Sequence, residues 1–105
     1  MIKTSNIIAV AQETIQPDDG DLLALDYYLR LYTGPEGETL YGIRLDMRYP
    51  GGDLIEREET EGLSSCMEDI TILAEAFARG AVVPYVLHEM VEDSFCPIEK
   101  KLSVF

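Results

Sequence analysis

The single histidine of the chain lies in the string that comes closest to a metal-binding motif. If this segment is a helix, His88 and Glu92 are about one turn apart and share a face, with Glu89 beside them. Residues 88–92, His-Glu-Met-Val-Glu, match the first half of the H-E-x-x-H zinc motif, but Glu92 replaces the second histidine. A catalytic zinc usually takes three protein ligands, so a further ligand would have to come from elsewhere. We expect a solvated helix face, and keep a small metal- or ligand-dependent enzyme organised around these three residues as the alternative function.

Other motifs for catalysis or ion binding fail on spacing. The aspartates within residues 18–21 do not follow the calcium-loop pattern, so we expect a polar turn there. Cys96 follows His88 by eight residues, about 12 Å along a helix, which is too far for direct proton transfer. Neither of the glycine-rich patterns that cradle phosphates is present. The sequence therefore predicts no catalytic residue, no metal ligand and no cofactor.

Arginine and tyrosine side chains point to a different chemistry, that of a protein–protein interface. Three arginines and two tyrosines in predicted strands lie, by strand alternation, on the face opposite the leucines. Both residue types are enriched at interfaces. The other interpretation, which does not exclude the first, is that the arginines pair across strands with Asp26, Asp46 or glutamates of the fourth strand. The candidate interaction surface consists of Tyr28, Arg30, Tyr32, Arg44 and Arg48.

The first sixty residues must supply the sheet that carries this surface. A run rich in isoleucine and valine predicts a strand over residues 6–16, and alternating apolar and polar residues predict strands over 22–33 and 41–49. A weaker strand is expected over residues 53–60, and turns rich in glycine, proline and aspartate separate the four. The fourth strand is dense in charge, which suits an exposed sheet edge.

The apolar period then changes from 2 to 3.6, which predicts two helices. Ser65 begins a capping-box pattern with Glu68, and Gly80 is expected to end the first helix in a left-handed conformation. Pro84 is well placed to open the second helix, which Pro97 ends. The expected core consists of Leu29, Leu31, Ile43, Leu45, Ile70, Leu73, Phe77, Leu87 and Val91.

Together these elements predict one α+β domain over residues 1–105: an antiparallel four-stranded meander followed by two helices packed on one sheet face. The strands occupy about residues 6–60, the helices about 65–96, and a C-terminal tail 97–105. Two helices cover one face of the sheet, so the opposite face must meet water or a partner.

Three short motifs resemble those of a family of roughly hundred-residue bacterial proteins of unknown function. They are Tyr41-Gly42-Ile43, then Glu61-Gly62-Leu63-Ser64, and Val82-Val83-Pro84 leading to Leu87 and Val91-Glu92-Asp93. The resemblance covers about Tyr41 to Phe95. It implies a bacterial cytoplasmic setting and supplies no catalytic or binding residues.

The net charge excludes some classes of binding partner. The 105 residues include eight Lys and Arg against twenty Asp and Glu, a net charge of −12. Nucleic acids and anionic membranes both require clustered basic residues, so we expect neither as a partner. Cys66 and Cys96 form no paired motif, which suits free thiols in the cytoplasm. We therefore expect a small acidic non-enzymatic interaction or regulatory module that binds another protein or itself as a homodimer.

Overall fold

The computed structural model describes residues 6–18 and 20–92. The elements in chain order are β1 (Ile7–Ile15), β2 (Leu23–Thr33), β3 (Thr39–Arg48), β4 (Leu54–Glu59), α1 (Met67–Arg79) and the short 3₁₀ helix η1 (Pro84–Val86). The chain continues from η1 as α-helix over residues 87–92. Phe95, Cys96, Pro97 and the predicted tail lie outside the described residues.

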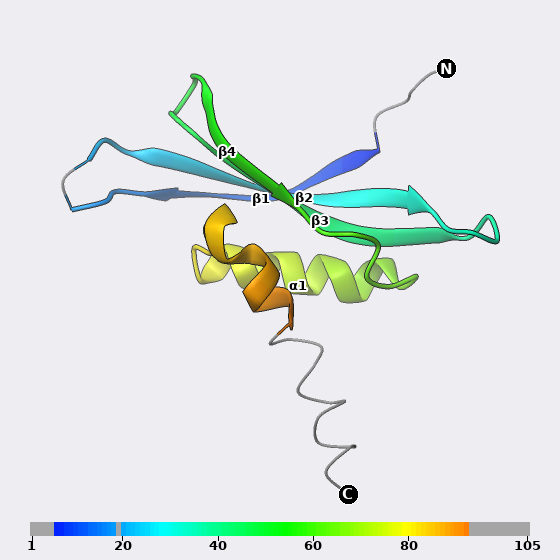
Figure 1. The fold of residues 1–105 in the computed structure, drawn as a ribbon. Helices are drawn as coiled ribbons and strands as arrows, with labels where there is room; N and C mark the ends of the chain where they lie inside the picture. The colour runs from blue at the N-terminus through cyan, green and yellow to red at the C-terminus, as the bar shows by residue number, and fades with distance from the viewer. Residues whose placement is uncertain (1–5, 19, 93–105) are drawn as a thin grey trace, which may run out of the picture.

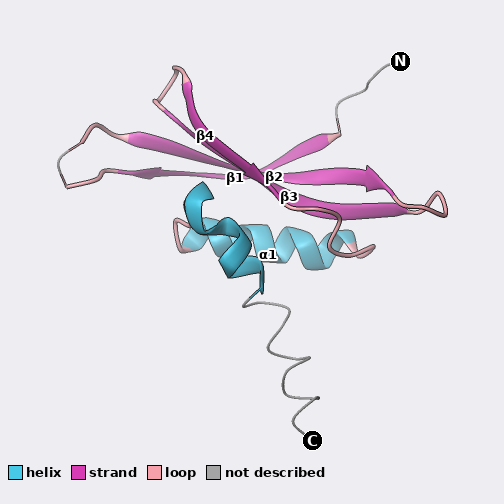
Figure 2. Ribbon diagram, in the orientation of Figure 1, coloured by secondary structure: helices cyan, strands magenta, loops and turns pink. Residues whose placement is uncertain are grey.

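The four strands form one antiparallel meander in the order β1-β2-β3-β4. In Figures 1 and 2, α1 and the helix that follows it lie on the same side of this sheet. No other described segment lies over the opposite side (Figure 2). The predicted α+β fold is confirmed, and β4, which carries four charged residues in six, is an edge strand as expected.

The core lies between the sheet and the two helices. Alternate residues of the central strands β2 and β3 point toward the helices and are fully buried, among them Leu25, Tyr27 and Leu45. They pack with Ile70 of α1 and with Leu87 in one apolar cluster. The fully buried apolar side chains of these strands alternate in the predicted register. A one-residue slip would have exchanged the two faces of the sheet.

Two members of the expected core are less buried than predicted. Leu31, two residues from the end of β2, is only partly buried, and so is Leu73 of α1, which packs against the rim of the apolar cluster. The other seven residues of the expected core are buried.

Helix α1 begins later than the capping-box pattern predicts. Its N-cap is Cys66, with no side-chain hydrogen bond, so the prediction that Ser65 caps the helix is wrong. The backbone of Ser64 is bridged to Tyr41 of β3 by hydrogen bonds, which hold the chain extended up to that point. The serine side chain that binds the backbone at the start of α1 is that of Ser64, whose Oγ accepts a hydrogen bond of 2.9 Å from the Cys66 N–H.

The left-handed residue that ends α1 is Ala81 (φ 52°), one position after the predicted Gly80 (φ −91°). The Val82 N–H donates to the Phe77 carbonyl at 3.0 Å, and the Ala81 N–H donates to the Ala78 carbonyl at 3.0 Å. This is the hydrogen-bond pair of a Schellman motif, in which the residue between the cap and the returning apolar residue is left-handed. Because Val82 returns into the core beside Phe77, the motif places Ala81 at that position.

Candidate functional site

The five residues of the predicted interaction surface share the side of the sheet that no described helix covers. Tyr28 pairs across strands with Arg44, and Arg48 lies opposite Ala24 on the same side. We call this side the open face. Its strand residues used below are Ala9, Gln12, Asp26, Tyr28, Arg30, Tyr32, Arg44, Asp46, Arg48, Arg57 and Glu59.

Two buried aspartates lie at the centre of the open face. Asp26 and Asp46 are direct cross-strand partners, although like charges in that position repel each other. Their side chains are only 9% and 7% exposed. Buried carboxylates of this kind require paired cations, and the surrounding arginines supply them.

Asp46 is held by two arginines at once. Arg57 of β4 donates to Oδ1 at 2.8 Å and to Oδ2 at 3.2 Å, and Arg44 donates to the same oxygens at 3.2 and 3.0 Å. Burial alone would raise the pKa of Asp46, but the hydrogen bonds and charges of Arg57 and Arg44 outweigh it and hold the pKa below its ordinary value. The carboxylate is therefore ionised at neutral pH and is a weak proton acceptor.

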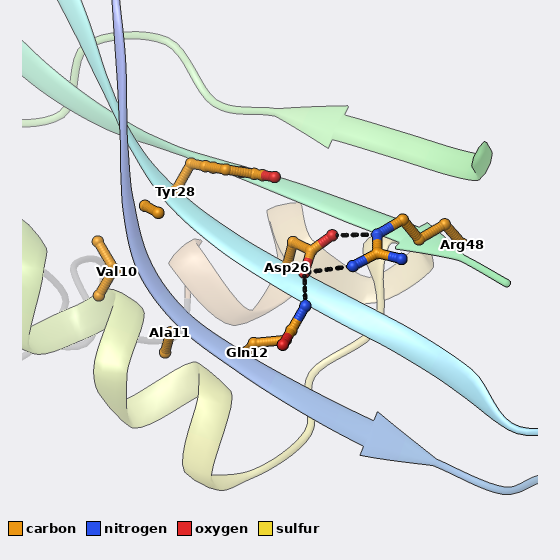
Figure 3. Close-up of a pocket in the computed structure, with 7 residues that line it drawn as sticks. Val10, Ala11, Gln12, Asp26, Tyr28 and Arg48 are labelled. Carbon is orange, nitrogen blue, oxygen red and sulfur yellow. Dashed lines mark hydrogen bonds and ion pairs between the residues drawn. The ribbon is translucent and has the colours of Figure 1, made fainter. Parts of the chain in front are cut away.

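Asp26 is held by one arginine and one amide. The Nε of Arg48 donates to Oδ2 at 2.6 Å and Nη2 to Oδ1 at 3.4 Å, while the Nε2 of Gln12 donates to Oδ1 at 2.7 Å. Figure 3 shows the side chains of Gln12 on β1 and Arg48 on β3 converging on Asp26, which lies on the strand between them. The contacts tie β1, β2 and β3 together on the open face.

The tyrosines lie against the same arginines. The guanidinium of Arg44 is 5.2 Å from the ring centroid of Tyr28, and that of Arg30 is 5.1 Å from the ring centroid of Tyr32. Both distances are within the range of cation–π attraction. The Tyr32 hydroxyl also donates to the Thr60 carbonyl. The rings are therefore held in place before any partner arrives.

All three predicted arginines have carboxylate partners. Arg44 pairs with Asp46, Arg48 with Asp26, and Arg30 with Glu59 of β4. The cross-strand pairing of the other interpretation is thus present for Arg48 and Arg30, whereas Arg44 pairs with Asp46 of its own strand. It fixes the side chains of the open face without covering them, since the three arginine side chains remain 17–30% exposed.

A hollow of about 450 Å³ opens on the β1 side of the open face. It is lined by Ala9, Val10 and Ala11 of β1 together with Gln12, Asp26, Tyr28 and Arg48 (Figure 3). A β-bulge lies between Ala9 and Ala11, and the small alanine side chains leave the space that larger neighbours enclose.

The sequence reasoning missed Gln12. Unbroken alternation from Ile7 places Gln12 on the helix side of β1, but the bulge shifts the strand by one residue and turns Gln12 toward Asp26. The only sequence feature at the bulge is the run Ala9-Val10-Ala11. Small residues such as alanine are compatible with a bulge, but they do not predict one.

At the alternative site, the structure places one ligand-capable side chain beside His88. His88 Nε2 lies 3.2 Å from Glu58 Oε1 of β4, and the two side chains are 62% and 40% exposed. Glu89 and Glu92 are exposed. Within residues 6–18 and 20–92, no group of three or more metal-ligating side chains is arranged around a common point.

The remaining candidates of the sequence analysis are the aspartates of residues 18–21 and the two cysteines, and some of them lie outside the described residues. Asp18 lies within a turn in which the Gly20 N–H donates to the Pro17 carbonyl, and Asp21 follows this turn, while Asp19 is not described. Cys66 is a free, exposed thiol, and Cys96 is not described.

Comparisons with known proteins give one result. Residues 6–96 match a family model whose description is "Family of unknown function (DUF6514)". The comparisons with curated proteins and with solved structures found no match. In the part of the chain that the structure describes, no helix has the length and apolar character needed to span a bilayer.

Proposed function

The chain belongs to the family of unknown function DUF6514, and we propose that it is a small acidic interaction or regulatory module, not an enzyme, whose contact surface is the open face. The proposal places it in the bacterial cytoplasm, where reducing conditions keep a thiol such as that of Cys66 free. Its partner is another protein or a second copy of the chain.

The observation that carries this proposal is a sheet face that no described residue covers and that is built from tyrosine and arginine side chains held by their neighbours. Antiparallel sheets can leave one face to water, but such a face has no need of stacked aromatic rings. Tyr28 and Tyr32 are each stacked with an arginine that a carboxylate holds in turn. Side chains fixed in advance lose less conformational entropy on binding, which favours affinity.

The enzyme alternative has weaker support. It requires His88, Glu89 and Glu92 to act together, whereas the contact that the structure gives His88 is with Glu58. Two ligands are fewer than the three that a catalytic zinc usually takes. The carboxylates of the open face, in turn, are occupied by arginines and suit recognition better than proton transfer.

The test compares two double variants of equal chemistry. Tyr28→Ala with Arg44→Ala removes a stacked pair from the open face. Tyr85→Ala with Arg79→Ala removes the same residue types from exposed positions of the helix layer. Each tagged protein is used to capture partners from its native cells, and capture is quantified against wild type.

We expect the open-face variant to lose at least about tenfold of its capture, equivalent to about 1.4 kcal/mol, and the helix-layer variant to keep it. Circular-dichroism melts confirm that the variants are folded, and Tyr28→Ala alone serves if the loss of Arg44 from Asp46 unfolds the protein. Equal capture by both double variants would refute the proposal.

A further inference from the structure

The charge of the described chain is divided unevenly between the open face and everything else. The strands of the open face carry four arginines and three carboxylates, so this surface is almost neutral. Elsewhere in residues 6–18 and 20–92, Arg79 is the one Lys or Arg against fourteen carboxylates, counting Glu61 at the rim. The molecule is thus a nearly neutral sheet face backed by a strongly acidic remainder.

This division of charge limits the kinds of surface that can bind the open face. Every arginine of the open face has a carboxylate partner, so the surface offers no free cation to an anionic polymer. A strongly basic partner would be attracted to the acidic remainder and not to this face. The surface that fits is another nearly neutral one, rich in tyrosine and paired arginine.

We infer that the open face packs against the open face of a second copy, forming a two-fold symmetric homodimer with the helices outside. The inference rests on the proposed function, because it uses the same contact surface. In such an isologous contact each copy supplies the same patch, so the composition matches by construction.

The two-fold arrangement also places the two acidic helix layers far apart. Stacked sheets pack about 10 Å apart, and each acidic helix layer lies on the outer side of its own sheet. The two layers are therefore separated by more than the Debye length of about 8 Å at physiological salt. Packing the open face onto the helix layer of the next copy would instead leave an open head-to-tail chain.

The shape of the open face suits interdigitation of two sheets. The hollow beside Ala9, of about 450 Å³, lies next to the ring of Tyr28 (Figure 3). A recess beside an aromatic ring gives the face an uneven surface, which sheet-on-sheet packing uses because facing side chains fill the gaps between each other.

The area of the open face indicates how tightly two copies are expected to associate. Four strands about 4.8 Å apart, with about eight residues each at 3.3 Å, give roughly 500 Å² per copy. The total of about 1,000 Å² is at the lower limit for a specific assembly. We therefore expect a reversible dimer that forms at micromolar concentrations or above.

The test is sedimentation of the full chain over a concentration series up to about 500 µM, at about 20 mM and about 500 mM NaCl. Ala9→Glu places a charged side chain in the hollow, and Ala76→Glu makes the same change on the exposed side of α1. Both positions are exposed alanines, and both variants have the same net charge.

We expect the mass to rise from 11.8 kDa toward twice that value with concentration. High salt should strengthen association, since it screens the repulsion between two chains of charge −12. Ala9→Glu should weaken it at least about tenfold and Ala76→Glu should not. A wild type that stays at 11.8 kDa throughout, association weakened by salt, or equal effects of both variants would overturn the homodimer.

The failure of this inference is distinguishable from that of the proposed function. A monomeric wild type whose Tyr28→Ala, Arg44→Ala variant still loses partner capture would refute the homodimer and leave the open face as a contact surface for another protein.

Discussion

At the scale of single residues, Asp46 shows how the open face tolerates charge in its centre. Its carboxylate lies opposite Asp26 on the neighbouring strand, a repulsive position that only the flanking arginines make acceptable. Arg44 and Arg57 approach it from the same strand and from β4. One buried carboxylate thus joins two strands and fixes the arginine on which the Tyr28 ring stacks.

Asp46→Asn should lower the free energy of unfolding at pH 7 by about 1–3 kcal/mol, because both arginines lose a charged acceptor. The figure is moderate because the Arg57 side chain is 41% exposed and can be hydrated. The pKa of Asp46 is lowered in the folded state, so its contribution is complete above the unfolded pKa and is lost as pH falls through the lower folded value.

Urea denaturation across the acid range measures this effect. The difference between wild type and Asp46→Asn should shrink progressively below about pH 4. Asp53→Asn, an exposed carboxylate in the turn before β4, makes the same change in net charge and should leave stability nearly unaltered. A difference for Asp46→Asn that is constant down to acid pH would contradict the assigned ion pairs.

Residue positions on the open face were largely predictable, and their pairings were not. Strand alternation is local, so it predicts that Tyr28, Arg30 and Arg44 share a face. Which arginine meets which carboxylate depends on the register between strands, which no local pattern contains. Gln12 was assigned to no site because one bulged residue reverses the alternation of β1.

At the scale of elements, the ends of α1 show where tertiary contacts override local signals. The capping pattern at Ser65 is valid locally, but the bridge between Ser64 and Tyr41 determines where the helix begins. At the other end the apolar return of Val82 decides which residue is left-handed. The order of the strands and helices followed from apolar periodicity and from the turn and proline residues between the elements, whereas the ends of α1 depended on contacts distant in sequence.

The helix end gives a paired prediction. Ala81→Gly should raise the free energy of unfolding by up to about 1 kcal/mol, because a left-handed alanine is strained and glycine is not. Gly80→Ala should be neutral or stabilising by up to about 1 kcal/mol, since a Cβ there meets its nearest atoms at 3.7 Å or more. Chemical denaturation of both variants measures the signs. Destabilisation by both would mean that Gly80, not Ala81, is the left-handed residue.

The two edge strands are protected in different ways. β4 carries charges at four of six positions, which makes pairing with another chain unfavourable. β1 carries one charged residue in nine, Glu13, and its ladder is interrupted by the bulge at Ala9/Ala11. Bulges at sheet edges also limit edge-to-edge pairing. Both edges are therefore poor sites for strand pairing with another chain.

At the scale of the whole molecule, the structure is a two-layer α+β protein with one face of its sheet unoccupied by described residues (Figure 1). The layer order explains why charge is segregated: the helices and loops bear most of the carboxylates, and the open face binds its few within ion pairs. We propose that this face is the contact surface of the protein.

Site-specific photo-crosslinking in the native cell tests that claim most directly. A photoreactive phenylalanine analogue replaces Tyr28 on the open face in one strain and Tyr85, an 84% exposed tyrosine of the helix layer, in another. We expect a discrete crosslinked species from position 28, of twice the chain mass if the partner is a second copy, and none from position 85. Crosslinks from position 85 with none from position 28 would contradict the account.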